Sequence, residues 1–144
     1  MERNQYIPVM IQSLKKKSEI LDTIMELNIR QSEELENPAL DPDDFDKTVE
    51  EKSKQIEKLD LLDDGFQELF DRVKDDLKNH QDIYRDEIAQ MQDYIRKLTS
   101  KSATIQVQEA RNKDLMTKKF ASVHKQVREV RKSQRVVNQY YKNM

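Results

Sequence analysis

The most informative stretch of this sequence runs from Ile105 to Val137 and reads IQVQEARNKDLMTKKFASVHKQVREVRKSQRVV. Its apolar side chains recur at spacings that place them on one face of a helix. They are Ile105, Met116, Phe120, Val123, Val127, Val130 and Val137. The stretch has no Gly or Pro at which the chain would turn back over this face. The apolar face therefore needs a partner, either an earlier helix or another polypeptide.

The composition predicts an all-α protein. The 144 residues include one Gly, three Pro and no Cys or Trp, with 38% charged and only 35% hydrophobic residues. These values are typical of long helices that pack along narrow apolar seams, and too few apolar residues are present for a thick core. No signal-peptide core and no run of about 18 apolar residues is present, and cysteine is absent, so we expect a cytoplasmic protein.

The first helix is predicted over residues 8–36. Apolar residues and one asparagine follow each other at seven-residue spacing, which is typical of a helix seam. They are Ile7, Leu14, Leu21, Asn28 and Leu35. The helix is expected to stop before Asn37-Pro38, because a proline disfavours a helical residue before it.

The second helix is predicted over residues 42–77. Asp41 is suited to cap its start and Pro42 to occupy its first position. Gly65 lies inside the pattern and marks either a kink or the end of a shorter helix. We favour the kink, because the seven-residue spacing of Leu59, Phe66 and Val73 continues across it.

The third helix is predicted over residues 81–141, with a weak polar interruption and a potential kink at 99–102. At 1.5 Å per residue the three helices would measure roughly 43, 50 and 90 Å. The sequence therefore predicts a single domain over residues 1–144: an elongated, antiparallel, coiled-coil-like bundle of three helices with a long third helix. The first two helices are too short to cover the third, so the stretch from Ile105 to Val137 is the candidate binding surface.

The net charge of −2 hides a strong division along the chain. Between Glu33 and Glu87, 20 acidic residues accompany 8 basic ones, a local balance of −12; from Lys101 onward, 11 basic residues accompany 3 acidic ones, a balance of +8. This pattern fits either solvated faces that help to orient antiparallel helices or a charged surface that steers a partner.

No pattern in the sequence indicates catalysis. His80 and His124 lack the spacing of metal ligands, and one glycine is too few for a phosphate-binding loop. Neighbouring carboxylates such as Asp63 and Asp64 point about 100° apart on a helix, so they do not readily share a proton or a metal. We therefore expect no enzyme activity, no metal and no cofactor.

Two segments of the chain resemble the FlgN-type flagellar export chaperones. One is the start of the second helix, Asp41-Pro42-Asp43-Asp44-Phe45, followed by Val49, Lys52, Ile56 and Leu59 at helical spacing. The other is the pattern Ile105-Gln106-x-x-Glu109-x-x-Asn112-x-x-x-Met116-x-x-x-Phe120-x-x-Val123. In architecture the resemblance covers nearly the whole chain.

The resemblance implies a cytoplasmic chaperone that binds the amphipathic carboxyl-terminal helices of flagellar hook-associated junction proteins. It would prevent their premature assembly and deliver them to the type III export gate. The family's cargo-binding helix corresponds here to Asn112, Met116, Phe120, Val123, Val127 and Val130. Tyr140 and Tyr141 are similarly implied as the contact with an export-gate component.

Two alternatives remain open at this stage. A structural coiled-coil protein would use the same apolar face to form a homodimer, which the chaperone could also form when free of cargo. A nucleic-acid-binding protein would use the basic carboxyl-terminal part to displace counterions from phosphates. The valine stripe within the basic helix and the acidic middle of the chain argue against nucleic acid, and no membrane insertion is expected.

Overall fold

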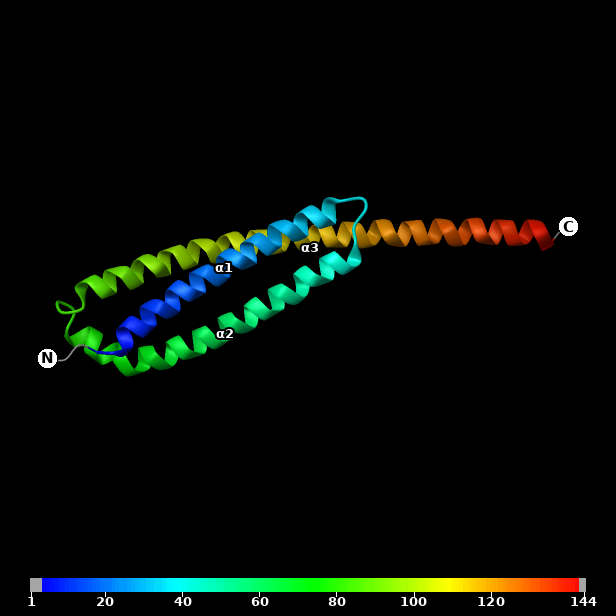
Figure 1. Cartoon of the computed structure of the whole chain (residues 1–144). Coiled ribbons are helices and arrows are strands. Elements are labelled where there is room, and N and C mark those ends of the chain that lie inside the picture. The colour runs from blue at the N-terminus through cyan, green and yellow to red at the C-terminus, as the bar shows by residue number, and fades with distance from the viewer. Residues whose placement is uncertain (1–3, 143–144) are drawn as a thin grey trace.

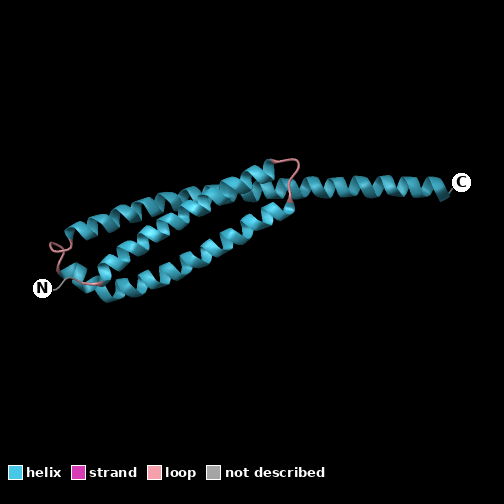
Figure 2. Ribbon diagram, in the orientation of Figure 1, coloured by secondary structure: helices cyan, strands magenta, loops and turns pink. Residues whose placement is uncertain are grey.

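The structure is a computed structural model that describes residues 4–142; beyond Ser122 it describes the side chains of Arg128 and Arg135 only. Three helices make up this part of the chain, α1 (Tyr6–Glu36), α2 (Pro42–Asn79) and α3 (Arg85–Lys142). Short connections join them at opposite ends, and no strand occurs among the described residues (Figures 1 and 2). The predicted all-α bundle with a long third helix is confirmed.

α1 forms the centre of the bundle. It packs against both other helices, whereas the α2 and α3 backbones nowhere approach within 8 Å of each other in the described residues. All five residues of its predicted seam are buried: Ile7, Leu14, Leu21, Asn28 and Leu35. α2 contributes only Val73 to the fully buried apolar core. Phe70 continues the apolar spacing of Phe66 and Val73 on α2, and Ile95 lies at helical spacing from Met91 and Leu98 on α3, yet the two remain 40% and 49% exposed.

The helix starts follow from local capping. α1 begins at Tyr6, two residues before the predicted start; its N-cap residue Gln5 makes no side-chain cap bond, but the Asn4 side chain accepts a hydrogen bond from the Tyr6 amide at 2.9 Å. Pro8 is tolerated there because first-turn amides have no partner within the helix. At the start of α2, the Asp41 carboxylate accepts from the Asp43 amide at 3.0 Å and Pro42 occupies the first position, as predicted.

α3 begins at Arg85, four residues later than predicted. Residues 80–84 form turns, and the Tyr84 amide donates to the His80 carbonyl at 3.2 Å. Tyr84 is 1% exposed, and its hydroxyl accepts from the Asn4 amide at 2.9 Å. Burying this large side chain against the start of α1 accounts for the turn. The helical pattern in the sequence began one turn too early, because Tyr84 fits both the turn and the seam.

The two positions at which the longer helices were expected to kink or end, Gly65 and residues 99–102, are both helical. α2 is helical through Gly65, and α3 is helical through residues 99–102. Gly65 has no positive backbone φ, and a Cβ atom placed there would meet no atom within 4 Å. Neither position ends a helix.

The uncovered part of α3 begins later than the sequence indicated. Ile105 packs against the core, Arg111 forms an ion pair with Glu36 at 2.7 Å, and the Lys119 ammonium donates to the Asn37 carbonyl at 3.0 Å. The prediction that α3 is uncovered from Ile105 onward is therefore wrong, because α1 and the connection after it extend to Lys119. Residues 123–142, the projecting segment, continue beyond the bundle for about 30 Å (Figure 1).

Candidate functional site

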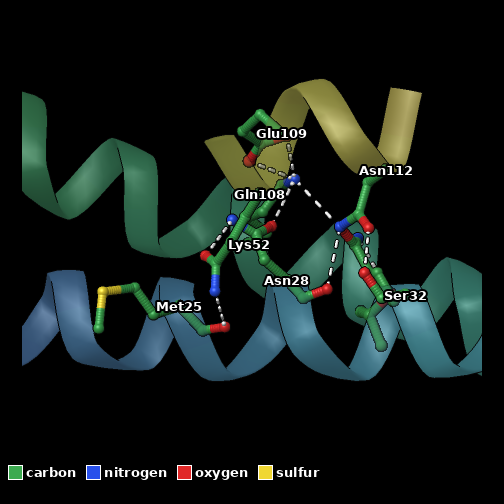
Figure 3. Close-up of polar contacts among 9 residues, drawn as sticks. Met25, Asn28, Ser32, Lys52, Gln108, Glu109 and Asn112 are labelled. Carbon is green, nitrogen blue, oxygen red and sulfur yellow. Dashed lines mark hydrogen bonds and ion pairs between the residues drawn. The ribbon is translucent and has the colours of Figure 1, made fainter. Parts of the chain in front are cut away.

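A polar cluster crosses the bundle before α3 leaves it. Its members come from all three helices: Asn28 and Ser32 from α1, Lys52 from α2, and Gln108, Glu109 and Asn112 from α3 (Figure 3). Asn28 is fully buried and donates to the Gln108 side chain at 3.2 Å, while Gln108 donates to the Met25 carbonyl at 3.3 Å. Buried polar groups are tolerated when they are hydrogen-bonded. At this level of the bundle, hydrogen-bonded polar side chains thus lie between the helices in place of apolar ones.

Asn112 belongs to this cluster. It is 4% exposed, its amide nitrogen donates to the Asn28 carbonyl at 2.9 Å, and its side-chain oxygen accepts from the Ser32 hydroxyl. Its side chain therefore points into the bundle in this structure. The family resemblance places Asn112 on the cargo surface, but in the structure its side chain is buried, whereas that of Phe120 is exposed.

An apolar pocket lies where the connection between α1 and α2 meets α3. We call it the loop pocket. Its apolar lining is provided by Leu35, Pro38, Leu40, Pro42, Phe45, Met116 and Phe120. Met116 is half-buried, and Phe120 is 59% exposed. Two residues from the expected cargo surface thus form one wall of a pocket, and the connection with the adjoining ends of α1 and α2 forms the other wall.

Local hydrogen bonds hold the wall formed by the connection. The Asn37 side chain accepts from the Ala39 amide at 2.9 Å, and the Asp41 cap fixes the start of α2. Lys119 ties the Asn37 carbonyl to α3. Asparagine and aspartate form such turns because their short side chains reach backbone amides two residues ahead. The loop pocket is therefore organised before any ligand arrives.

The charge around this surface changes sign along its length. Four exposed carboxylates stand beside the loop pocket, on Asp41, Asp43, Asp44 and Asp46. The projecting segment carries six basic residues and one acidic residue: Lys125, Arg128, Arg131, Lys132, Arg135, Lys142 and Glu129. Arg128 and Arg135 are exposed. Acidic side chains therefore outnumber basic ones beside the loop pocket, where Lys119 is the one basic residue in the described lining, and the surface is basic beyond the bundle.

Comparison with known proteins identifies the family. The FlgN protein family model matches residues 1–143. The chain belongs to the FlgN family. No curated protein and no solved structure matches it. FlgN is a family of flagellar export chaperones, so the match assigns this chain to flagellum biogenesis and implies binding to hook-associated proteins.

The remaining expected site residues of this FlgN protein lie on the projecting segment. The side chains of Val123, Val127, Val130, Tyr140 and Tyr141 lie outside the described residues. The backbone of α3 is helical through Lys142, so the sequence spacing of the three valines puts them on one helix face. Met116 and Phe120 precede them at the same spacing.

The sequence did not single out Leu40 as part of the site, and it indicated Phe45 only as part of the motif Asp41-Pro42-Asp43-Asp44-Phe45. An apolar residue between two prolines of a connection, as in Pro38-Ala39-Leu40-Asp41-Pro42, is the signal that would have found the pocket. Within the described residues no group of three or more potential metal-ligating side chains comes together. None of the helices there combines the length and apolarity of a membrane span.

Proposed function

We propose that this FlgN protein binds the amphipathic carboxyl-terminal helices of flagellar hook-associated proteins in the cytoplasm, prevents their premature assembly and delivers them to the type III export gate. One observation carries the proposal: α3 continues as a helix beyond the ends of α1 and α2, and the sequence of this part carries an apolar stripe. A helix of matching pattern is the natural partner of such a stripe.

We assign the cargo contact to Met116, Phe120, Val123, Val127 and Val130. Met116 suits this role because its flexible thioether side chain adapts to different partners. Asn112 supports the surface indirectly by anchoring the root of the helix to α1. Tyr140 and Tyr141 are assigned to the export-gate component, because aromatic residues near a helix end suit a second, transient contact.

The apolar area accounts for a useful affinity. If one cargo helix buried about 600 Å² of apolar surface, the gross gain would be roughly 15 kcal/mol at about 25 cal/mol per Å². Association and the ordering of side chains cost several to more than ten kcal/mol of this gain. If this cost is about 4–7 kcal/mol, the remaining gain corresponds to micromolar to nanomolar binding. Burial of the cargo's own apolar face would also prevent its assembly.

Co-expression with candidate hook-associated proteins tests the proposal. A stable one-to-one complex should be purified with the wild-type chain and lost with Val127→Asp. Val107→Asp is the matched control, because Val107 lies on the same helix, is 70% exposed and lies outside the proposed surface. Both variants should retain the circular dichroism spectrum and melting temperature. A Val127→Asp variant that still binds cargo would refute the assignment, and one that unfolds would show that the stripe belongs to the core.

The uncovered stripe also supports pairing of two cargo-free copies. A homodimer through the projecting segment would remove the same valines from water, and cargo would then compete with the second copy. Sedimentation equilibrium of the wild-type and Val127→Asp proteins tests this. We expect a concentration-dependent dimer that cargo dissociates and that the substitution abolishes. A wild-type monomer at all concentrations would eliminate the dimer and leave cargo binding untouched.

A further inference from the structure

The loop pocket lies at the bundle end of the proposed cargo surface and shares Met116 and Phe120 with it. Met116 and Phe120 line it from α3, four residues apart, and the valine stripe of the projecting segment continues from them at helical spacing. A helix lying along this stripe therefore ends at the pocket. The far wall is formed by Leu40 and Phe45, both half-buried.

We propose that the loop pocket and the acidic start of α2 form an anchoring subsite that selects the charge pattern of the bound helix. The ligand is an amphipathic helix with an apolar side chain at one end, basic residues flanking that end, and acidic residues along the remainder. The inference rests on the proposed function, because it assumes that a helix occupies the projecting segment.

The charges beside the pocket are available for a ligand. Asp41 uses its carboxylate to cap α2, and Asp44 has only a loose pairing with Lys47 at 4.0 Å. Among the described residues, no cation lies within ion-pair distance of the Asp43 or Asp46 carboxylate. Both side chains stand in the first turns of α2. A basic ligand end would gain from these carboxylates.

The reversal of sign along the surface gives the pocket its selectivity. The acidic residues of a bound helix would face the basic projecting segment, while its basic end would face Asp43 and Asp46. The opposite placement would bring like charges together at both ends. Complementary charge of this kind contributes more to partner choice and to the rate of encounter than to affinity. The apolar contact in the loop pocket fixes one end of the bound helix, so that its charged residues are aligned with the acidic and basic parts of the surface.

The pocket also suits an anchor because its wall is held in place. The Asn37 turn, the Asp41 cap and the Lys119 contact fix the connection without a ligand. A ligand side chain would thus enter a site that needs little rearrangement, and preorganisation reduces the cost of binding.

Two synthetic amphipathic peptides test the proposal. They share one composition and one apolar stripe. In the segregated peptide, basic residues flank one end and acidic residues follow; in the interleaved peptide, the two signs alternate. Fluorescence anisotropy with the full chain at about 50 mM salt gives both dissociation constants. We expect the segregated peptide to bind about fivefold tighter, with the difference shrinking at about 500 mM salt.

Variants of the full chain locate the effect. Asp43→Lys with Asp46→Lys should remove the preference for the segregated peptide. Asp60→Lys with Asp64→Lys is the matched control, since both residues are exposed acids of α2 far from the pocket. Phe45→Ala should weaken both peptides, and Leu40→Ala provides a second test of the pocket should Phe45→Ala alter the circular dichroism spectrum.

The outcomes separate this inference from the proposed function. Equal binding of both peptides, together with no effect of Phe45→Ala and Leu40→Ala, overturns the subsite; so does the failure of both peptides to bind the wild-type chain. If Val127→Asp abolishes the binding of cargo in either case, the cargo surface stands. If Val127→Asp has no effect while the pocket variants abolish binding, the pocket binds helices by itself and the cargo assignment to the projecting segment fails.

Discussion

The Lys52 ammonium on α2 lies 2.7 Å from one oxygen and 2.9 Å from the other oxygen of the Glu109 carboxylate on α3. The same ammonium donates to the side-chain oxygens of Asn28 at 3.1 Å and Gln31 at 3.2 Å, so one cation joins all three helices. A shift in register would separate the buried side chains of Asn28 and Gln31 from this donor, which is costly. The cluster therefore fixes how α2 and α3 are aligned on α1.

Replacing Lys52 by Met should destabilise the bundle by about 1–3 kcal/mol. The Lys52 side chain is only 16% exposed, and its loss would leave the oxygens of Asn28 and Gln31 without their donor. Urea denaturation followed by circular dichroism measures the change. Lys54→Met is the control on an exposed position, where an effect within about 0.5 kcal/mol is expected. Equal effects of the two substitutions would contradict the role of the cluster.

Substitution of Asn112 by Ala tests whether this residue stabilises the bundle or binds cargo directly. Loss of the bonds to the Asn28 carbonyl and the Ser32 hydroxyl should reduce the free energy of unfolding by about 1–3 kcal/mol. Below the melting temperature the folded fraction should bind cargo with nearly unchanged affinity, as measured by isothermal titration calorimetry. A large loss of affinity without a loss of stability would show instead that Asn112 touches cargo.

Gly65→Ala should stabilise the protein by about 0.5–1 kcal/mol. The position is helical, exposed and free of atoms within 4 Å of the new Cβ, while alanine loses less backbone entropy than glycine on folding. Thermal unfolding measures the gain. The reverse change at an exposed position of α3, Ala103→Gly, should produce a loss of similar size. A destabilising Gly65→Ala would show that α2 requires extra bending at this position.

Deletion of residues 138–144 should preserve cargo binding and impair secretion. The deleted residues follow the proposed cargo surface and include Tyr140 and Tyr141, which we assign to the export gate. Affinity for purified cargo and the amount of secreted hook-associated protein are measured for the same truncation. Loss of both would place the tail in the cargo site, whereas loss of neither would remove it from the mechanism.

Binding to duplex DNA should be weak and easily abolished by salt. The basic residues of α3 surround an apolar stripe, and the acidic α2 lies beside its root. Phosphate contacts weaken steeply between about 50 and 200 mM salt, whereas an apolar helix contact persists. Titration of the full chain against DNA and against cargo at both salt concentrations makes the comparison. Tight duplex binding with a steep salt dependence would favour the nucleic-acid alternative.

The three helices and the buried seam of α1 could be predicted from the sequence, because both depend on residues that are close to each other along the chain. Seven-residue spacing placed Leu14 and Leu21 in the core, and the Asp41-Pro42 signal placed the start of α2. Helix periodicity and capping involve residues within one or two turns, so no knowledge of the neighbouring helices was needed.

The tertiary structure alone decided which seam residues find a partner. Phe70 and Ile95 fit the seam pattern but remain partly in water, because α2 and α3 each pack closely against α1, while their backbones do not approach within 8 Å of each other in the described residues. Periodicity gives the direction of a side chain on its own helix and carries no information about what lies opposite. The alignment of α3 on α1 likewise depends on contacts across 80 or more residues, such as Asn28 with Gln108.

The candidate site divides in the same way. The sequence by itself determined the helical stripe that includes Phe120 and Val127, since a stripe is a property of one helix. Only the tertiary structure turned Asn112 inward and brought Leu40 and Phe45 against Met116 to form the loop pocket. Those side chains are distant in sequence, and the packing that joins them is set by how far α1 and its connection extend along α3.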